Sequence, residues 1–422
     1  MPVVLDRVHR CALCETTQVG LLRCGGCRLV RYCCRDHQVQ HRSKHKKTCK
    51  TSVELRNRLE EEEDLVRHAT PDFMTPANAF DTHIGHFWGV VTTRDYMQAR
   101  FELADYAVGL RTLDGVREGL DHYKDMIRLN RSDNMGLRDR VPALMLRLDQ
   151  DQQCYDFIKW YATGPDDNYD WGDMSLPFLN IRDADVLEDP AFLVREWGSL
   201  NHQVAIQLLK MKMLIDIRQL KIVKKVLRGR LPVELWNLVE QEAVRSPLSS
   251  RFVGNSYTEL VKTEHMLSLQ CRKLGVGILD TNGGFTYELL ECNQETLDYR
   301  PEAYCHGSYE ERALAVQNCY AAWQETAGAL ELLKDARSCA ARNSENEVQT
   351  YLKHDRDGRT PEQMLSDLSV NRIWGYLEYA IHNGSYLGPP EDRPSERYYR
   401  EARALAEEEG PDRMLFSDEE SD

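Results

Sequence analysis

Eight cysteine and histidine residues near the N-terminus constrain this chain more than any other feature. They follow the pattern Cys11-x2-Cys14-x9-Cys24-x2-Cys27-x5-Cys33-x3-His37-x7-His45-x3-Cys49. Two cysteines separated by two residues lie on one tight turn, so both sulfurs reach the same tetrahedral zinc ion. Residues four apart project from one face of a helix, which adds two further ligand pairs. Because four pairs complete two four-coordinate sites, we predict two structural zinc ions within residues 11–49.

The spacing leaves two assignments open. The four pairs can form either interleaved or sequential sites. His41 lies one helical turn beyond His37 and competes with it as the sixth ligand, but His37 preserves the four-residue spacing and is preferred. Fifty residues with few large apolar side chains cannot build a sufficient core. Zinc, at roughly 10–16 kcal/mol per structural site, would supply the folding free energy.

The distribution of cysteines favours metal over disulfides. Seven of the 13 cysteines fall within residues 11–49, and the other six show no paired spacing. The first ten residues lack the apolar stretch of a secretory signal, and no segment is apolar enough to span a membrane. We therefore expect an intracellular protein, nuclear or cytoplasmic and not secreted, whose thiols stay reduced and which has no membrane partner.

Charge divides the chain into a basic and an acidic part. Residues 1–50 carry 11 Lys and Arg against 3 Asp and Glu, a formal charge of +8, whereas the whole chain carries −14. The remaining residues therefore sum to −22. Opposite charges of this size indicate that the N-terminal module and the body can contact each other.

The ligand pattern resembles the MYND finger at every ligand position, with histidine in place of the usual cysteine at the sixth. The aromatic Tyr32 before the fifth ligand, Gln38 after the sixth and Lys46 after the seventh fit the same family. The resemblance implies interleaved sites, one formed by Cys11, Cys14, Cys33 and His37 and the other by Cys24, Cys27, His45 and Cys49. It also implies a protein-interaction module.

Two residues depart from the family pattern. His37 occupies the sixth ligand position, where the family usually has cysteine; imidazole is a sound zinc ligand, so zinc binding is expected to survive. Arg42 replaces the usual tryptophan in a region that lines the groove of family members that bind proline-rich peptides. This replacement argues against ordinary proline-motif binding. We take Tyr32, Gln38, Arg42 and Lys46 as the candidate partner-binding residues.

Residues 93–163 have the periodicity of helical hairpins. Apolar residues recur at helical spacing after Thr92 and Thr93, either of which can cap the first helix. Similar residues recur 34 positions apart: Leu103 and Leu137, Ala107 and Val141, Leu110 and Leu144, Tyr123 and Phe157, Met126 and Trp160. This period resembles the tetratricopeptide repeat, in which Ala107 and Gly119 would lie where helices approach closely. A simple bundle of amphipathic helices is an equal alternative.

The fold class predicted from these patterns is mainly α: a small N-terminal two-zinc MYND finger followed by an all-α helical-hairpin body. Residues 164–190 carry eight acidic residues and one arginine and are expected to form a loop that Tyr169, Trp171 and Phe178 hold to the surface. The predicted organisation is a finger (1–50), a helical connector (51–92), tetratricopeptide-like hairpins (93–163), the acidic loop (164–190), a further helical domain (191–409) and a disordered acidic tail (410–422). Within the further helical domain, one helix is expected to begin at Leu231-Pro232, with the proline in its first turn, and others to cover roughly 309–341 and 394–409.

These features bear on three possible functions. A zinc-dependent adaptor, scaffold or regulatory protein that binds protein partners is favoured, because both zinc sites are closed and no nucleophile, base and orienting group stand together. A nucleic-acid-associated transcriptional regulator that uses the basic finger is the alternative. A SET-type lysine methyltransferase is least favoured, because the Asn-His-Ser-Cys element and the Cys-x-Cys-x2-Cys motif of that class are absent. We expect that the protein is not an enzyme.

Overall fold

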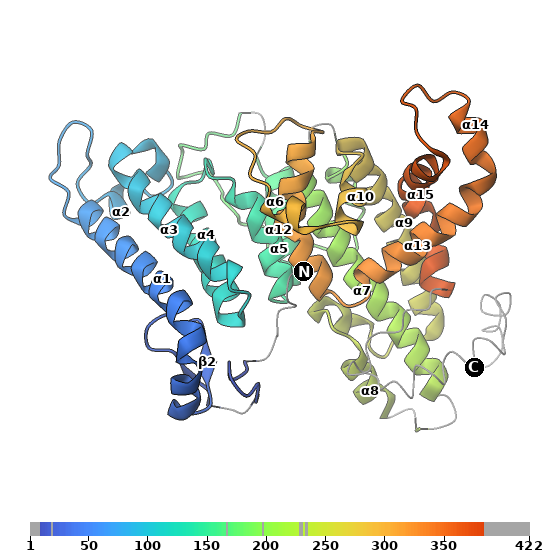
Figure 1. Ribbon diagram of the computed structural model, residues 1–422, viewed down its shortest axis with the longest axis horizontal. Coiled ribbons are helices and arrows are strands. Elements are labelled where there is room, and N and C mark those ends of the chain that lie inside the picture. The colour runs from blue at the N-terminus through green and yellow to red at the C-terminus, as the bar shows by residue number, and fades with distance from the viewer. Residues whose placement is uncertain are drawn as a thin grey trace. The chain divides into compact units, whose positions relative to one another are not determined.

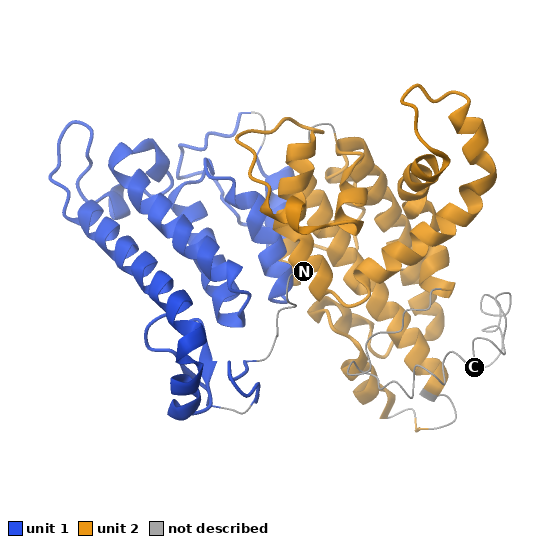
Figure 2. Cartoon of the chain, in the orientation of Figure 1, with its two compact units in different colours: residues 1–150, 156–182 blue, residues 151–155, 183–422 orange. Residues whose placement is uncertain are grey.

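The computed structural model describes residues 9–17, 20–165, 168–195, 198–227, 231–232 and 235–383. Within these residues it contains fifteen α-helices and one two-stranded sheet, so the predicted mainly α fold with a small N-terminal zinc-binding region is confirmed. The chain divides into two compact units, one of residues 1–150 and 156–182 and the other of residues 151–155 and 183–422 (Figure 2).

The first unit contains the finger and the first helical pairs. Its elements are β1 (Leu22–Arg23), β2 (Arg31–Tyr32), α1 (Arg35–Arg67), α2 (Ala79–Thr82), the 3-10 turns η1 (Phe87–Gly89) and η2 (Val91–Thr93), α3 (Arg94–Gly109), α4 (Leu113–Leu129), α5 (Leu137–Arg147) and most of α6 (Asp151–Thr163). The long helix α1 packs against α3, and α3 packs against α4 (Figure 1). The predicted boundary at residue 50 falls inside α1, so one continuous helix links the finger to the connector.

The pairing of α3 and α4 depends on small residues and on local caps. A β-carbon added at Gly119 would lie 2.3 Å from Val108 Cγ2 and 3.0 Å from Ala104 O, so this close approach requires glycine. Thr112 caps α4 by accepting a hydrogen bond from the N–H of Gly115. Thr93 stands at the N-cap of α3, as predicted, but its hydroxyl donates to the carbonyl of Val90 at 2.9 Å instead of capping the helix.

Aromatic side chains hold the acidic loop to the first unit, as expected. The ring of Trp160, on α6, lies 5.0 Å from that of Phe178, 5.8 Å from that of Tyr169 and 6.2 Å from that of Trp171, centroid to centroid. Arg131 adds hydrogen bonds to loop carbonyls, including that of Asp173 at 3.3 Å, and its guanidinium lies over the ring of Phe178. Long loops without helices or strands order themselves in this way by packing their own side chains.

The second unit is a helical domain. Its elements after the first residues of α6 are η3 (Pro190–Phe192), α7 (Leu200–Leu227), α8 (Trp236–Ala243), η5 (Pro247–Phe252), α9 (Tyr257–Thr281), α10 (Phe285–Leu290), α11 (Gln294–Asp298), α12 (Tyr309–Glu325), α13 (Ala329–Ser344), η6 (Glu345–Glu347), α14 (Val348–Leu352) and α15 (Pro361–Asn383). Helix α7 packs against α9, and α13 packs against α15 (Figure 1). A capping box of Ser256 and Glu259 begins α9.

Helix α7 is buried around most of its circumference and carries polar groups that are satisfied inside the unit. Lys212 Nζ lies 2.7 Å from Asp151 Oδ1, and both side chains are almost inaccessible to solvent. Lys210 Nζ donates to the carbonyl of Val186 at 2.9 Å and to Gln270 Oε1 at 2.7 Å. These contacts compensate the desolvation of each ammonium group, which otherwise opposes its burial.

One helical prediction in the second unit is wrong. A single helix expected over residues 309–341 is two helices, α12 and α13, because Gly328 adopts a left-handed conformation with φ of 90° between them. Where a helix is expected to begin at Leu231-Pro232, the N–H of Leu235 donates to the carbonyl of Pro232 at 3.0 Å and α8 begins at Trp236; residues 233–234 lie outside the described residues. A predicted helix over 394–409 and the predicted tail 410–422 lie outside the described residues. None of the helices that the structure describes is both long and apolar enough to cross a membrane.

Candidate metal centre

Two tight turns and one helix position the eight predicted ligands. Each Cys-x2-Cys turn ends on a residue with positive φ, Glu15 at 59° and Arg28 at 62°. In each turn the N–H of that residue donates to the carbonyl of the first cysteine, at 2.9 Å in the first turn and 3.0 Å in the second. Strands β1 and β2 pair in antiparallel register and lead into α1, which carries the three C-terminal ligands.

The eight side chains form two clusters of four. Cys11, Cys14, Cys33 and His37 form the first cluster, and Cys24, Cys27, His45 and Cys49 form the second; within each, all ligand atoms lie within 4.8 Å of one another. The arrangement is therefore interleaved, and it includes His37 and not His41. His41 Nδ1 instead lies 3.0 Å from the hydroxyl of Tyr32, and its ring stacks on His45.

The separations within each cluster fit a tetrahedral zinc ion. Such an ion holds two sulfurs roughly 3.8 Å apart and a sulfur and a nitrogen roughly 3.6 Å apart. The sulfurs of Cys14 and Cys33, and those of Cys24 and Cys49, are 3.7 Å apart. Cys11 Sγ is 3.6 Å from His37 Nδ1, and Cys27 Sγ is 3.4 Å from His45 Nε2. The contact of Cys33 Sγ with His37 Nδ1, at 2.9 Å, is clearly shorter than this geometry requires.

The pKa values of the clustered thiols also indicate that a cation binds between them. Burial disfavours the Cys11 thiolate, but the backbone N–H groups of Cys14, Leu13 and Cys33 outweigh it and lower the Cys11 pKa to about 5. Burial and the neighbouring Cys24 raise the pKa of Cys27 to about 12. Thiols this close ionise together only when a cation compensates their charge, as bound zinc does. Burial, reinforced by His41, lowers the pKa of His45 and favours the neutral imidazole that binds zinc.

Glycine at position 26 makes room for the second cluster. A β-carbon on Gly26 would lie 2.9 Å from the sulfur of Cys49 and 3.5 Å from Cγ2 of Val53. Two Cys3His clusters with this geometry fit two structural zinc ions, which confirms the predicted cofactor. Protein ligands fill all four positions of each tetrahedron, so each zinc would organise the fold and leave no position for a substrate.

The finger is packed against the first helical pair of its own unit. The core of the finger, which contains Leu21, Leu29 and Tyr32, extends to Ala107 on α3. Tyr106 on the same helix donates its hydroxyl to the carbonyl of Thr48 at 3.1 Å. The helix pair therefore completes the small apolar core that the finger lacks when considered alone.

One carboxylate on α4 forms ion pairs with two arginines of the finger at this contact. Asp114, only 6% exposed, accepts two hydrogen bonds from Arg31, and Arg23 Nη2 lies 2.8 Å from its Oδ1. Burial favours the neutral acid, but the hydrogen bonds of Arg31 and the charges of both arginines outweigh it and lower the pKa of Asp114. Nearby, Arg56 on α1 pairs with Glu118 at 2.5 Å and donates to the carbonyl of Cys27 at 3.0 Å.

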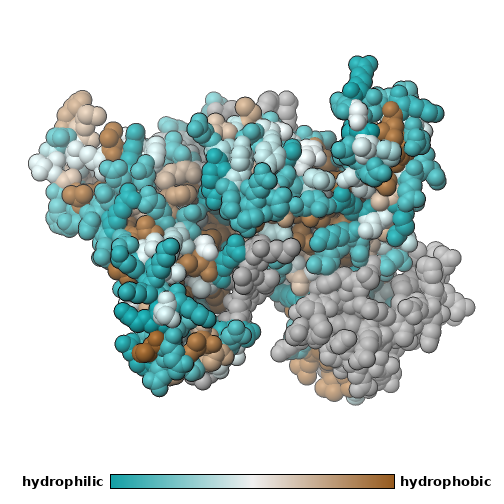
Figure 3. Space-filling model, viewed as in Figure 1, coloured by the Kyte–Doolittle hydropathy of each residue, from teal (hydrophilic) through white to brown (hydrophobic). Residues whose placement is uncertain are grey.

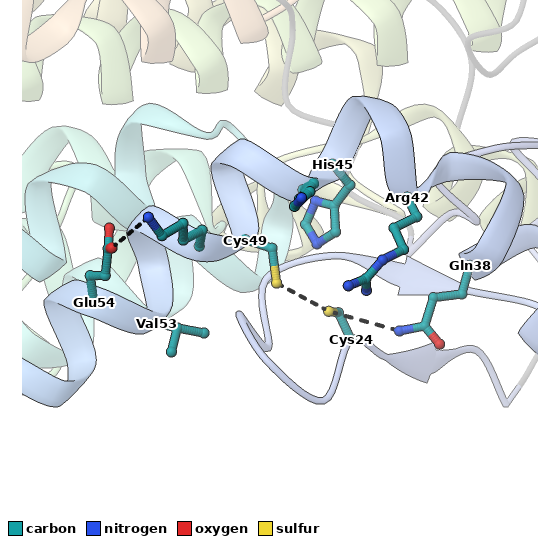
Figure 4. Close-up of a pocket in the computed structure, with 9 residues that line it drawn as sticks. Cys24, Gln38, Arg42, His45, Cys49, Val53 and Glu54 are labelled. Atoms are coloured by element: carbon teal, nitrogen blue, oxygen red, sulfur yellow. Dashed lines mark hydrogen bonds and ion pairs between the residues drawn. The ribbon is translucent and has the colours of Figure 1, made fainter.

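The four candidate partner-binding residues do not share one environment. Gln38, Arg42 and Lys46 line a groove beside the second cluster, together with Cys24, His45, Cys49, Lys50, Val53 and Glu54 (Figure 4). The prediction that Tyr32 contacts a partner is wrong, because its side chain is 2% exposed and packs in the core of the finger. Figure 3 shows a mostly hydrophilic surface over the finger and α1, where Leu22 and Val39 are among the exposed apolar residues.

Sequence reasoning missed three groups at this site. Val53 and Glu54 line the groove because α1 continues beyond Cys49, the last ligand. Val53 lies four residues after Cys49, and Glu54 lies eight residues after Lys46, so helical spacing could have placed both on the groove face. The sequence did not indicate that Asp114 binds the finger, because an acidic residue in the first turn of a helix is favourable there without a partner. Its role depends on residues 83 and 91 positions away.

Comparison with known proteins agrees with this geometry. Searches among curated proteins and among solved structures find no match for the chain. A family model does match, and it covers the eight ligands from the first to the last. Residues 11–49 match the MYND finger.

Proposed function

We propose that this protein is an adaptor that binds protein partners through its zinc-dependent finger. The observation that carries the proposal is the combination of two closed Cys3His clusters with an open basic groove beside one of them. Closed sites serve as scaffolds, so the zinc ions would act by holding the groove in shape. On the same ground we propose that the protein is not an enzyme that uses zinc.

Contact with the helical pair supports a fixed orientation of the finger. Ala107 contributes to the core of the finger, and Asp114 binds Arg23 and Arg31. A partner would therefore meet the groove and the adjoining helices as one rigid surface. Rigid presentation lowers the entropy lost on binding and so strengthens association.

The helical pairs provide a candidate second surface. Helix α3 packs against α4 and approaches it closely at Gly119, and α4 packs against α5, which supports tetratricopeptide-like packing of successive helices. We propose that they bind a further protein segment, as stacked helical hairpins do. The proposed location is intracellular, in the nucleus or the cytoplasm, because the many free thiols persist in reducing compartments.

Nucleic-acid binding is less well supported. Proteins that bind single strands stack bases on aromatic rings, but no Phe, Tyr or Trp is among the described residues that line the groove. Two of the finger's arginines, Arg23 and Arg31, are already engaged by Asp114. The finger does not support a methyltransferase, because all of its ligands are used for zinc.

Affinity capture from cells, with the full chain as bait, tests the adaptor proposal. Cys24→Ser removes a ligand of the second cluster, and Cys34→Ser is a matched control in a half-buried cysteine that belongs to neither cluster. We expect proteins that bind the wild type and Cys34→Ser but are lost with Cys24→Ser. An unchanged set of partners with Cys24→Ser would place recognition in the helical body and contradict the role of the finger.

A further inference from the structure

The groove beside the second cluster is a continuous feature of α1. Its lining residues on that helix are 38, 42, 45, 46, 49, 50, 53 and 54, which recur at helical spacing and occupy one face. Its volume is about 430 Å³, within the range of sites that hold a small ligand or a few side chains. Figure 4 shows Gln38, Arg42, His45 and Cys49 along this face, with Cys24 opposite them.

Two cations in the groove have no partner in the described part of the chain. Arg42 and Lys46 are exposed, and neither forms a hydrogen bond or an ion pair there. Lys50, one turn further, is paired with Glu54 at 3.2 Å. Arg23 and Arg31, on the strands of the finger, are bound to Asp114. The uncompensated positive charge of the groove is therefore concentrated at Arg42 and Lys46.

The groove also has a small apolar component. Val53 and the sulfurs of Cys24 and Cys49 lie among its lining groups, and Gly26 leaves the adjoining turn without a side chain. A short apolar side chain fits such a surface, whereas the flanking cations require acceptors. Guanidinium and ammonium groups recognise carboxylates, and the planar guanidinium can do so with two hydrogen bonds.

We propose that this groove binds an acidic peptide segment of a partner protein, with carboxylates at Arg42 and Lys46 and a small apolar residue at Val53. The inference rests on the proposed function as a protein-binding adaptor and specifies the chemistry of its partner. Arg42 stands where the family resemblance anticipates a tryptophan, so the ring that would pack on proline is replaced by a group that binds carboxylates. Charge complementarity thus shifts the preference from proline-rich to acidic segments.

Selection from a random library of twelve-residue peptides, displayed on phage, tests this with the full-length protein loaded with zinc. The test variant is Arg42→Glu with Lys46→Glu. The matched control is Lys44→Glu with Lys47→Glu, which makes the same change in charge at two exposed cations of α1 that do not line the groove. Zinc content and circular dichroism establish that both variants are folded.

We expect the selected peptides to be enriched in Asp and Glu around an apolar residue. The groove variant should bind them roughly tenfold or more weakly than the control variant does, because two attractive contacts become repulsive. Binding should also weaken as NaCl rises from about 0.05 M to about 0.5 M, since salt screens exposed charges.

Several results would overturn the proposal. These are selected peptides without acidic enrichment, proline-rich peptides, or equal affinity for the groove and control variants. Tighter binding of a 20-nucleotide single-stranded RNA, lost in the groove variant alone, would assign the groove to nucleic acid. Equal binding of a peptide of residues 411–422, or self-association lost in the groove variant, would assign it to the chain itself. If affinity capture still depends on Cys24 in these cases, the adaptor proposal stands and only the acidic partner fails.

Discussion

Arg31 in the finger binds Asp114 at the start of α4 through two hydrogen bonds, 2.6 Å from Nε to Oδ2 and 2.9 Å from Nη2 to Oδ1. A pair of parallel bonds between guanidinium and carboxylate fixes orientation as well as distance. Arg23 adds a third bond to the same carboxylate at 2.8 Å. These ion pairs thus hold the finger on its helical pair, in addition to the chain connection through α1.

Replacement of Asp114 by Asn should destabilise this contact. The change removes the charge that compensates two arginines, and we expect the free energy of unfolding of the first unit to fall by about 2 kcal/mol at pH 7. Because the pKa of Asp114 is lowered, its stabilisation is complete above the unfolded pKa and is lost only as pH falls through the folded pKa. Urea unfolding at neutral pH measures the full effect. Asp121→Asn, an exposed acid on the same helix, is the control, and an equal loss there would contradict the account.

Gly119 should not tolerate a side chain. Gly119→Ala would place a methyl group against Val108 and the carbonyl of Ala104, and we expect a loss of about 1–3 kcal/mol in unfolding free energy. Gly109→Ala, at the end of α3, is the control, because a β-carbon there meets no atom within 4 Å. Thermal unfolding of both variants makes the comparison. A loss at Gly109 as large as that at Gly119 would show that packing is not the cause.

The relation between sequence and structure differs between these sites. The zinc ligands were predictable because each pair lies within a few residues, where spacing alone fixes geometry. The pairing of Arg31 with Asp114 was not, since no local pattern joins residues 83 positions apart. The break between α12 and α13 was missed because a single glycine within a helical pattern is compatible with a continuous helix. Only the left-handed backbone of Gly328, with φ of 90°, shows that the helix ends there.

Chelation should unfold the finger but spare the second unit. We expect removal of zinc to expose the amides of residues 11–17 and 20–49 to hydrogen exchange, because their fold depends on metal more than on a core. Amides of α3 near Ala107 should lose part of their protection, since that residue packs on the finger. Amides of α7 and α9 should be unchanged, as their core is formed within the second unit. Global loss of protection, or none in the finger, would contradict this prediction.

The two clusters should release zinc in order. In the first, Cys14 is exposed and Cys33 and His37 are half-buried, whereas three of the four ligands of the second are buried. A chelator therefore reaches the first cluster more readily. During slow chelation, iodoacetamide should modify Cys14 and Cys33 before Cys24 and Cys27, as mass spectrometry of peptides would reveal. The reverse order would show that burial does not control release.

The most direct test of the interleaved two-zinc finger combines native mass spectrometry with cysteine mapping of His37→Ala. The wild type and the control His41→Ala should each carry two zinc ions, and His37→Ala should carry one. In His37→Ala, Cys11, Cys14 and Cys33 should react with iodoacetamide while Cys24, Cys27 and Cys49 stay protected. Protection of Cys11 and Cys14 with exposure of Cys33 and Cys49, the result for sequential sites, would contradict the account.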